Sequence, residues 1–204
     1  LEFRRALPIY LDKKKMIISS IFQKKKFEYI VDWGSNDGLF SKYALSLGKS
    51  VSCVSLDSDP QVIDSLYLNS KNENLNLLPL VFDVCNPPVS YGFANEERES
   101  FLTYLKIDLN IVYALVHHLF ITENLPWEKI FSLFKNQGDL LIEFPLPDDV
   151  RVQNLLKLKS EPQEYLQNYT SHIFESELKK YFNIDELIKL DTRNIYYCTN
   201  LNEK

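Results

Sequence analysis

The feature that most restricts the fold of this sequence is a regular alternation of short apolar runs with segments of helical spacing. Five apolar runs, rich in β-branched and aromatic residues, are each followed by a helical segment. The last two runs are separated only by Asp191–Asn194, a connection so short that it permits only an antiparallel hairpin. We predict strands over residues 27–31, 51–56, 77–82, 110–116, 139–144, 184–190 and 195–199, and helices over 8–23, 39–47, 60–71, 96–105, 127–134, 150–159 and 174–181.

This order of elements predicts an α/β fold, with a doubly wound, Rossmann-like seven-stranded sheet that ends in an antiparallel hairpin. Several runs are apolar on both faces, and 110–116 is the clearest. Such runs are typical of parallel strands that helices cover on both sides. A length of 204 residues suits one domain with a short appendage. We place a basic, helical N-terminal appendage at residues 1–26 and the main domain at 27–204.

Charge separates these two parts. Residues 1–26 hold eight Lys or Arg and two acidic residues, a net charge of +6, so the remainder carries −11 of the total −5. An acidic body argues against a nucleic-acid partner, because such binding depends mainly on phosphate neutralisation. The basic segment could still contact an anionic partner; the alternative is that its lysines form a solvated helix face.

Composition also bears on location and on metals. No apolar run approaches the ~20 residues that span a bilayer, and the first 30 residues are basic and amphipathic rather than a signal peptide. The three cysteines are widely spaced, which favours neither a disulfide framework nor a zinc site. The acidic pair Asp148 and Asp149 has no matching ligands elsewhere, so we interpret it as solvated surface. We expect a cytoplasmic location, no membrane partner and no metal; the sequence does not indicate an oligomeric state.

The turn after the first predicted strand, Val31–Gly38, reads V-D-W-G-S-N-D-G. A glycine directly after a strand lets the backbone turn sharply and leaves room for a ligand at the edge where open α/β sheets bind nucleotides. Asp32, Asp57 and Asp83 each follow or end one of three consecutive strands. Any one of them could merely cap a helix, but three in register favour a ligand site. Asp57 suits the hydroxyls of a ribose and Asp83 the amine of an adenine.

The spacing of this turn distinguishes between two cofactor classes. A dinucleotide-binding turn has the pattern G-x-G-x-x-G, whereas Gly34 and Gly38 form G-x-x-x-G with Asp37 between them. A carboxylate there would repel a pyrophosphate. S-adenosylmethionine (SAM) has no phosphate and presents an ammonium and a sulfonium group, so the turn favours SAM.

Over residues 27–199 these segments resemble the class I SAM-dependent methyltransferases. The resemblance rests on 32–38, 56–60, 82–84 and the terminal hairpin. More narrowly, 56–60, 76–83, 114–119, 141–144 and 192–193 look like a bacterial branch of host-specific nodulation-type methyltransferases. Trp33 departs from that branch, which has a small aliphatic residue there, and its ring could narrow the cofactor pocket. The resemblance implies SAM as the cofactor, bound by Asp32, Gly34, Ser35, Asn36, Gly38, Asp57, Ser58, Asp83 and Val84.

Catalytic candidates follow the fourth predicted strand and end the fifth. His117 and His118 come directly after 110–116, where the resemblance places the transferred methyl group. A neutral imidazole there could take a proton from the attacking hydroxyl or amine. Neighbouring side chains at a strand end point in opposite directions, so one histidine should only pack. Glu143 is a second candidate, as a base or a substrate clamp.

Two further features leave alternatives open. Asn86-Pro87-Pro88 resembles the motif of amide-nitrogen methyltransferases, but it follows the third strand and ends in Val89, so we interpret it as a loop. Aromatic and basic side chains in two inserted segments either shape an acceptor pocket or bury the loops; they are Tyr91, Phe93, Arg98, Tyr165 and Tyr169.

The functional expectation is transfer of a methyl group from SAM to an O or N nucleophile, with a small molecule as acceptor. One alternative is a SAM-binding module without turnover. Another is an RNA or protein methyltransferase that uses the lysine-rich N-terminus. The acceptor itself cannot be read from the sequence.

Overall fold

The computed structural model describes residues 2–48, 51–135 and 137–201. The chain divides into two compact units, Leu1–Phe82 and Asp83–Lys204. The outer bounds of the predicted division, residues 1 and 204, lie outside the described residues, as do the side chains of Arg4 and Arg5 in the basic segment. The boundary at residue 26 stays a prediction.

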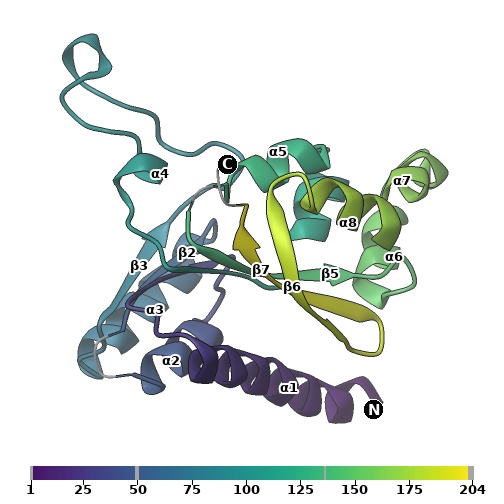
Figure 1. The fold of residues 1–204 in the computed structure, drawn as a ribbon, viewed down its shortest axis with the longest axis horizontal. Coiled ribbons are helices and arrows are strands. Elements are labelled where there is room, and N and C mark those ends of the chain that lie inside the picture. Colours follow the sequence, from purple (N-terminus) through teal and green to yellow (C-terminus); the bar gives the residue numbers. More distant parts are fainter. Residues whose placement is uncertain (1, 49–50, 136, 202–204) are drawn as a thin grey trace. The chain divides into compact units, whose positions relative to one another are not determined.

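The first unit contains three parallel strands in the order β3-β2-β1: β1 (Tyr29–Trp33), β2 (Ser52–Asp57) and β3 (Leu77–Val81). Three helices, α1 (Glu2–Lys24), α2 (Leu39–Ser46) and α3 (Pro60–Asn72), lie on one side of these strands (Figure 1). Ile18 and Ile21 of α1 are fully buried. The predicted helix over residues 8–23 is therefore present, and it begins earlier than the apolar spacing indicated.

Local sequence explains where α3 begins. Asp59 precedes the helix in an extended conformation, and its carboxylate accepts the backbone N–H of Gln61 at 2.9 Å. Pro60 occupies the first helical position, where its missing N–H leaves no bond unmade. α3 therefore begins three residues after Asp57, the last residue of β2.

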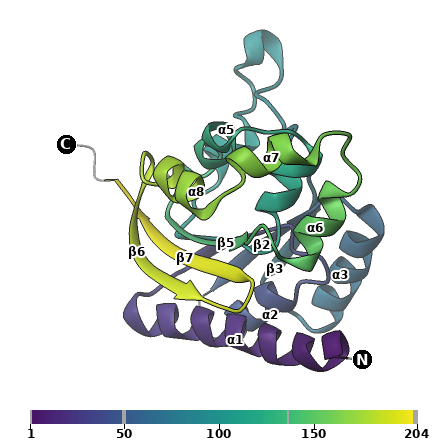
Figure 2. The same cartoon turned by 90° about the vertical axis from the view of Figure 1, so that its right-hand side faces the viewer.

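The second unit contains four strands in the order β4-β5-β7-β6: β4 (Leu109–Val112), β5 (Asp139–Pro145), β7 (Arg193–Asn200) and β6 (Phe182–Lys189). β4 and β5 are parallel, whereas β7 is antiparallel to both β5 and β6. The predicted terminal hairpin is confirmed. Four helices lie on one face of the β5-β7-β6 strands (Figure 2): α5 (Trp127–Ser132), α6 (Val150–Leu156), α7 (Pro162–Asn168) and α8 (Ser171–Leu178).

An aromatic cluster packs these helices onto β5. Trp127 lies edge-on to Phe144 and Phe174, with ring centroids 5.9 Å and 5.1 Å away. Tyr169 is fully buried in the same cluster, and its hydroxyl donates to the carbonyl of Pro145 at 2.8 Å. Of the two alternatives for Tyr169, the structure shows burial of the loop.

The predicted strand over residues 110–116 is wrong at its end, because β4 stops at Val112. Ala114 adopts a left-handed conformation (φ 52°), and its N–H donates to the Glu143 carboxylate at 2.6 Å. This bond joins Ala114 to β5 through a side chain, beyond the point where the backbone pairing of β4 and β5 ends at Val112 and Ile142. The following residues form a helical segment, η2 (His118–Thr122), so His117 and His118 do not lie at a strand end.

The predicted helix over residues 96–105 is also shorter than expected. Only α4 (Phe101–Tyr104) is helical, and its N-cap is Ser100, whose hydroxyl accepts the N–H of Thr103. The polar residues before it instead form a loop that contains a short 3₁₀ turn, η1 (Phe93–Asn95), and is closed by a bridge between Tyr91 and Arg98. Among the described residues, no helix combines the length and the hydropathy that crossing a bilayer requires.

Candidate functional site

The glycine turn after β1 contains three residues in the left-handed backbone conformation. Gly34, Asn36 and Gly38 have φ values of 70°, 48° and 74°. The N–H groups of Gly34 and Ser35 both donate to the carbonyl of Leu56, at 2.8 Å and 2.9 Å. Left-handed backbone costs little at glycine and at asparagine. The glycines thus allow the sharp turn that the sequence predicts, and the two bonds to Leu56 hold this turn at the end of β2.

Asp57 connects the end of β2 to the same turn. Its Oδ2 accepts the N–H of Asn36 at 2.9 Å, and its Oδ1 accepts the N–H of Asp59 at 3.0 Å. A carboxylate has about four acceptor sites, so both oxygens retain capacity for a ligand's hydroxyl groups. Asp57 is only half-buried, and the neighbouring Ser58 is exposed. The carboxylate is therefore both oriented by the protein and accessible.

The surroundings of the turn fit SAM. A cavity of about 290 Å³ beside it is lined by polar side chains that include Asn36, Asp37 and Asp59, and none of the described residues that line it is a lysine or arginine. Ser35 is 6% exposed, and its buried hydroxyl has no hydrogen-bond partner among the described residues. Buried polar groups are normally bonded, so this hydroxyl suits a polar ligand. Such a lining suits an ammonium group and hydroxyls better than a pyrophosphate.

Asp32, predicted as a cofactor residue, is buried near the end of β1, shortly before the turn. It is 2% exposed, and its Oδ2 accepts the hydroxyl of Ser41 at 2.6 Å, which in turn accepts the hydroxyl of Ser55 at 2.7 Å. Burial raises the pKa of Asp32 to about 6, against the lowering effects of Ser41 and of the positive charge of Lys14; the negative charge of Asp57 adds to the rise. Asp32 is thus bonded to α2, which follows the turn, and through Ser41 to β2.

This raised pKa predicts a pH-dependent stability. Between the ordinary value of 3.8 and about 6 the folded chain holds a proton on Asp32 that the unfolded chain has lost, so this group's contribution to the free energy of unfolding falls as pH rises through that range. Asp32→Asn keeps an acceptor for Ser41 and removes the titration. We expect its stability relative to wild type to increase from pH 4 to pH 7. Urea unfolding at both values measures this, and an unchanged difference would contradict it.

Asp83 and Val84 follow β3 and begin the second unit. The Oδ1 of Asp83 accepts the N–H of Cys85 at 2.8 Å, and its carbonyl accepts the N–H of Asn86 at 3.1 Å. The Asp83 side chain is exposed, whereas Val84 is 9% exposed. The local turn fixes the direction of Asp83 and leaves its second oxygen accessible.

The two histidines lie against each other, with ring centroids 4.2 Å apart. The prediction that they point in opposite directions is wrong, because the chain is helical here and not extended. His117 is 1% exposed, and its Nδ1 has no hydrogen-bond partner among the described residues. Burial, followed by the positive charge of its neighbour, lowers its pKa to about 3. The His118 side chain reaches the surface, but its ring is partly desolvated, and this desolvation together with the positive charge of Arg151 lowers its pKa.

Glu143, the third catalytic candidate, lies in an ion-pair cluster. Its side chain is 0% exposed; Oε2 accepts the N–H of Ala114 and Oε1 accepts Nη1 of Arg193 at 3.2 Å. Arg193 also donates from Nε to Oδ2 of Asp149 at 2.8 Å, and the hydroxyl of Thr192 donates to the same oxygen at 2.7 Å. These bonds, with the Arg193 charge, lower the pKa of Asp149 although burial opposes them.

The interpretation of the acidic pair as solvated surface is right for Asp148 and wrong for Asp149, whose side chain is 3% exposed. Its partner Arg193 lies 44 residues further along the chain, and only the hairpin brings the two together. The nearby sequence explains only one contact of the Asp149 side chain: as the N-cap of α6, its Oδ1 accepts the N–H of Arg151 at 2.8 Å. Among the described residues, no three His, Cys, Asp or Glu side chains are grouped as a metal site would require.

Sequence comparison finds one curated relative with a significant match. The nodulation protein NoeA of Rhizobium meliloti (strain 1021) is 29% identical over 170 residues, which cover 83% of this chain and 35% of that protein. The chain thus spans about a third of the length of this relative. No protein-family model matches the sequence.

Solved structures with a similar fold include several methyltransferases. The PH0226 protein of Pyrococcus horikoshii OT3 superposes with a TM-score of 0.64 at 16% identity, over 94% of this chain and 91% of that chain. Human N-acetylserotonin methyltransferase in complex with SAM gives 0.58 at 17% identity, over 97% and 55%. An rRNA methylase from Escherichia coli gives 0.59 at 16% identity, over 93% and 64%. The predicted α/β fold with its terminal antiparallel hairpin is therefore confirmed, and the chain has the fold of the class I methyltransferases, with the resemblance to a nodulation protein that its sequence indicated.

Proposed function

We propose that this chain transfers a methyl group from SAM to an oxygen or nitrogen nucleophile of a small molecule. The observation that carries the proposal is the arrangement of Asp57, which binds the N–H of Asn36 in the glycine turn while its oxygens remain accessible. The methyltransferase fold and the structural likeness to a SAM-bound methyltransferase support it.

Several of the predicted cofactor residues have a role in this proposal. Asp57 would accept the ribose hydroxyls, and Asp83 would accept the exocyclic amine of the adenine. Ser35 supplies a buried hydroxyl without a partner among the described residues, while Asp37 provides negative charge for the ammonium group. Asp32 would act as a positioning residue. Bound SAM supplies the methyl group on an already reactive sulfonium, so holding the reactants in line contributes most of the rate.

His118 is the residue that we propose as general base. It is exposed, and its lowered pKa keeps the imidazole neutral at physiological pH, as a proton acceptor must be. His117 is buried against it and would pack rather than react. Glu143, engaged with Arg193 and with the N–H of Ala114, would position the segment that carries the histidines.

Removal of the Asp57 carboxylate tests the cofactor assignment. Asp57→Ala should weaken binding of S-adenosylhomocysteine by about 2 kcal/mol or more, since it removes a charge-assisted contact to two hydroxyls. Asp64→Ala is a matched control, because Asp64 is an exposed aspartate on α3 of the same unit. Calorimetric titration of both variants measures the difference. Equal affinity in the two variants would contradict the assignment.

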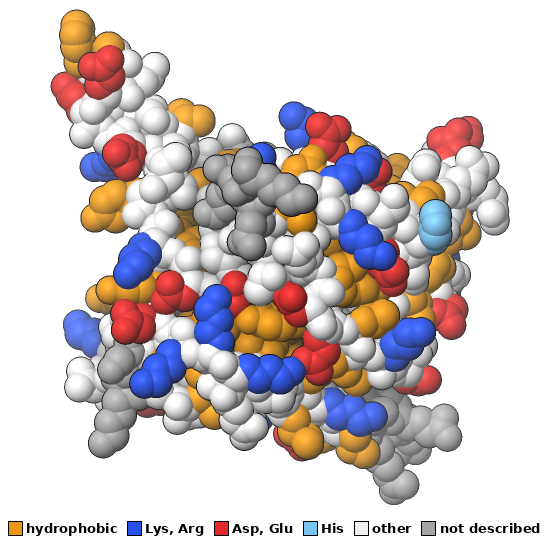
Figure 3. Space-filling view, in the orientation of Figure 1, with side chains coloured by type: hydrophobic (Ala, Val, Ile, Leu, Met, Phe, Trp, Pro, Cys, Tyr) orange, Lys and Arg blue, Asp and Glu red, His pale blue; other side chains and the backbone are white. Residues whose placement is uncertain are grey.

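We favour a small-molecule acceptor over RNA because residues 27–204 carry a net charge of −11. In the basic segment, Lys13 and Lys24–Lys26 are exposed, whereas Lys14 is not. Lys14 is 2% exposed, with its Nζ lying 4.4 Å from the centre of the Tyr10 ring and 5.3 Å from that of Phe40, so it is not available to phosphates. Figure 3 shows lysine and arginine side chains interspersed with acidic and neutral ones on the face in view.

We therefore expect no sub-micromolar binding of RNA at physiological salt. A filter-binding titration at several salt concentrations measures it. Tight binding that weakens by about 0.7–0.9 log units per phosphate contact for each decade of salt would instead favour an RNA methyltransferase.

A further inference from the structure

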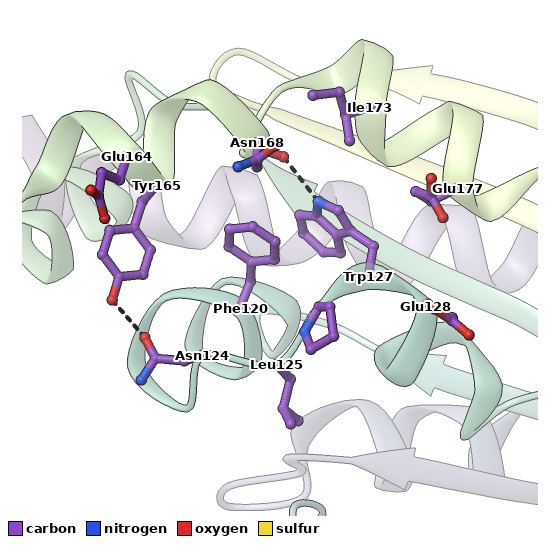
Figure 4. Close-up of a pocket in the computed structure, with 11 residues that line it drawn as sticks. Phe120, Asn124, Leu125, Trp127, Glu128, Glu164, Tyr165, Asn168, Ile173 and Glu177 are labelled. Carbon is purple, nitrogen blue, oxygen red and sulfur yellow. Dashed lines mark hydrogen bonds between the residues drawn. The ribbon is translucent and has the colours of Figure 1, made fainter.

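A second cavity, separate in sequence from the glycine turn, opens in the second unit between the η2 segment, α5, α7 and α8 (Figure 4). Its volume is about 520 Å³, within the range of about 300–1,000 Å³ typical of small-molecule sites. Phe120 stacks on Trp127 at 4.4 Å and 20°, and these two rings form the centre of the wall. Neither the fold nor the proposed methyl transfer assigns a use to this cavity.

The chemistry of the wall favours positive charge. Three of the eleven lining residues are aromatic and three are glutamates, and none of those described is a lysine, arginine or histidine. Glu164 and Tyr165 stand at one end of the aromatic wall, while Glu128 and Glu177 stand at the other (Figure 4). Aromatic faces and carboxylates both attract cations.

Two lysines of the chain already bind groups of this wall. Lys159 places its Nζ 5.1 Å from the centre of the Tyr165 ring and 3.3 Å from Oδ1 of Asn124, which also accepts the hydroxyl of Tyr165. At the other end, Nζ of Lys180 lies 2.6 Å from Oε1 of Glu177. The bond to Glu177 is the main cause of the raised pKa of Lys180, and Glu128 adds to it. Neither lysine lines the cavity itself, so Glu128, Glu164 and the Phe120 face remain for a ligand.

We propose that this cavity binds an organic ammonium cation with an apolar body. The apolar body would lie on Phe120 and the aliphatic side chains of Leu125 and Ile173, and the ammonium group would lie near the ring faces and the glutamates. A bare inorganic cation would leave most of the volume unfilled, and an anion would be repelled by the carboxylates. The proposal does not depend on methyl transfer, because it concerns binding by the chain without SAM.

Calorimetry with three probes of similar shape tests the proposal: 2-phenylethylammonium, the neutral 2-phenylethanol and the anion 3-phenylpropionate. We expect the cation to bind at least about fivefold more tightly than the alcohol, as one modest cation–π contact would give, and the anion to bind most weakly. Saturable binding of cation and alcohol with equal affinity would overturn the proposal, and so would no saturable binding of the cation at millimolar concentration.

A pair of matched variants locates the site. The double substitution Glu128→Gln and Glu164→Gln should abolish the preference for the cation while leaving binding of the alcohol. The control, Glu96→Gln and Glu99→Gln, removes the same charge from exposed positions outside the cavity and should leave the preference unchanged. An unchanged preference in the first variant, or an equal loss in both, would show that the cation does not bind here. All of these titrations omit SAM, so they can fail while the proposed function holds.

Discussion

Arg193→Ala should lower the free energy of unfolding by about 3–5 kcal/mol, the usual cost of removing one partner from a buried ion pair. Arg193 is 12% exposed and binds two carboxylates, Glu143 at 0% and Asp149 at 3% exposure. Without the guanidinium, both carboxylates would stay in the interior without their cation. Urea unfolding measures the loss.

Two control variants show whether the loss of stability comes from the buried ion pair. Lys42→Ala removes a partner of the more exposed Lys42–Glu73 pair and should leave stability close to wild type. Arg193→Lys keeps the charge but not the two-sided guanidinium contact, so it should fall between wild type and Arg193→Ala. A wild-type stability for Arg193→Ala would show that the cluster does not hold the second unit together.

His118→Ala should reduce methyl transfer by about 10²- to 10⁴-fold, the contribution typical of a positioned general base. Affinity for SAM should stay within about threefold, because the proposed cofactor contacts come from the glycine turn, Asp57 and Asp83. His117→Ala should mainly lower stability, since His117 is buried and the substitution leaves a cavity. Single-turnover rates with labelled SAM, together with unfolding curves, separate the two effects.

The pH profile gives an independent readout of His118. Its pKa is lowered from 6.5 by burial and by Arg151, so the imidazole stays neutral until the pH falls below that value. The rate should therefore be level near pH 7 and decline only below 6.5. If both histidine variants keep near-wild-type turnover, the histidines are structural, and Glu143 becomes the next catalytic candidate to test.

Much of the fold could be predicted because its signals are local. Strand runs, the glycine turn and the Pro60 start of α3 each follow from neighbouring residues, and the short connection before β7 permitted only an antiparallel hairpin. The end of β4 could not be predicted, because it depends on Glu143 capturing the N–H of Ala114 from 29 residues away.

The candidate site also combines features that local sequence predicts with features that depend on long-range contacts. The spacing of Gly34 and Gly38 and the position of Asp57 were visible in the sequence, since each lies directly after a strand. The burial of Asp149 and the pairing of Arg193 with Glu143 were not visible, because the partners lie 44 and 50 residues apart. The cavity beside Phe120 also depends on helices that only the tertiary fold brings together.

Titration of the wild-type protein with S-adenosylhomocysteine tests most directly whether this chain binds SAM. The arrangement of Asp57, Ser35 and the glycine turn predicts saturable binding to one site with a micromolar dissociation constant. Titration with NAD under the same conditions should give no comparable binding, because Asp37 would repel its pyrophosphate. Absence of saturable S-adenosylhomocysteine binding, or tighter binding of NAD, would contradict the account.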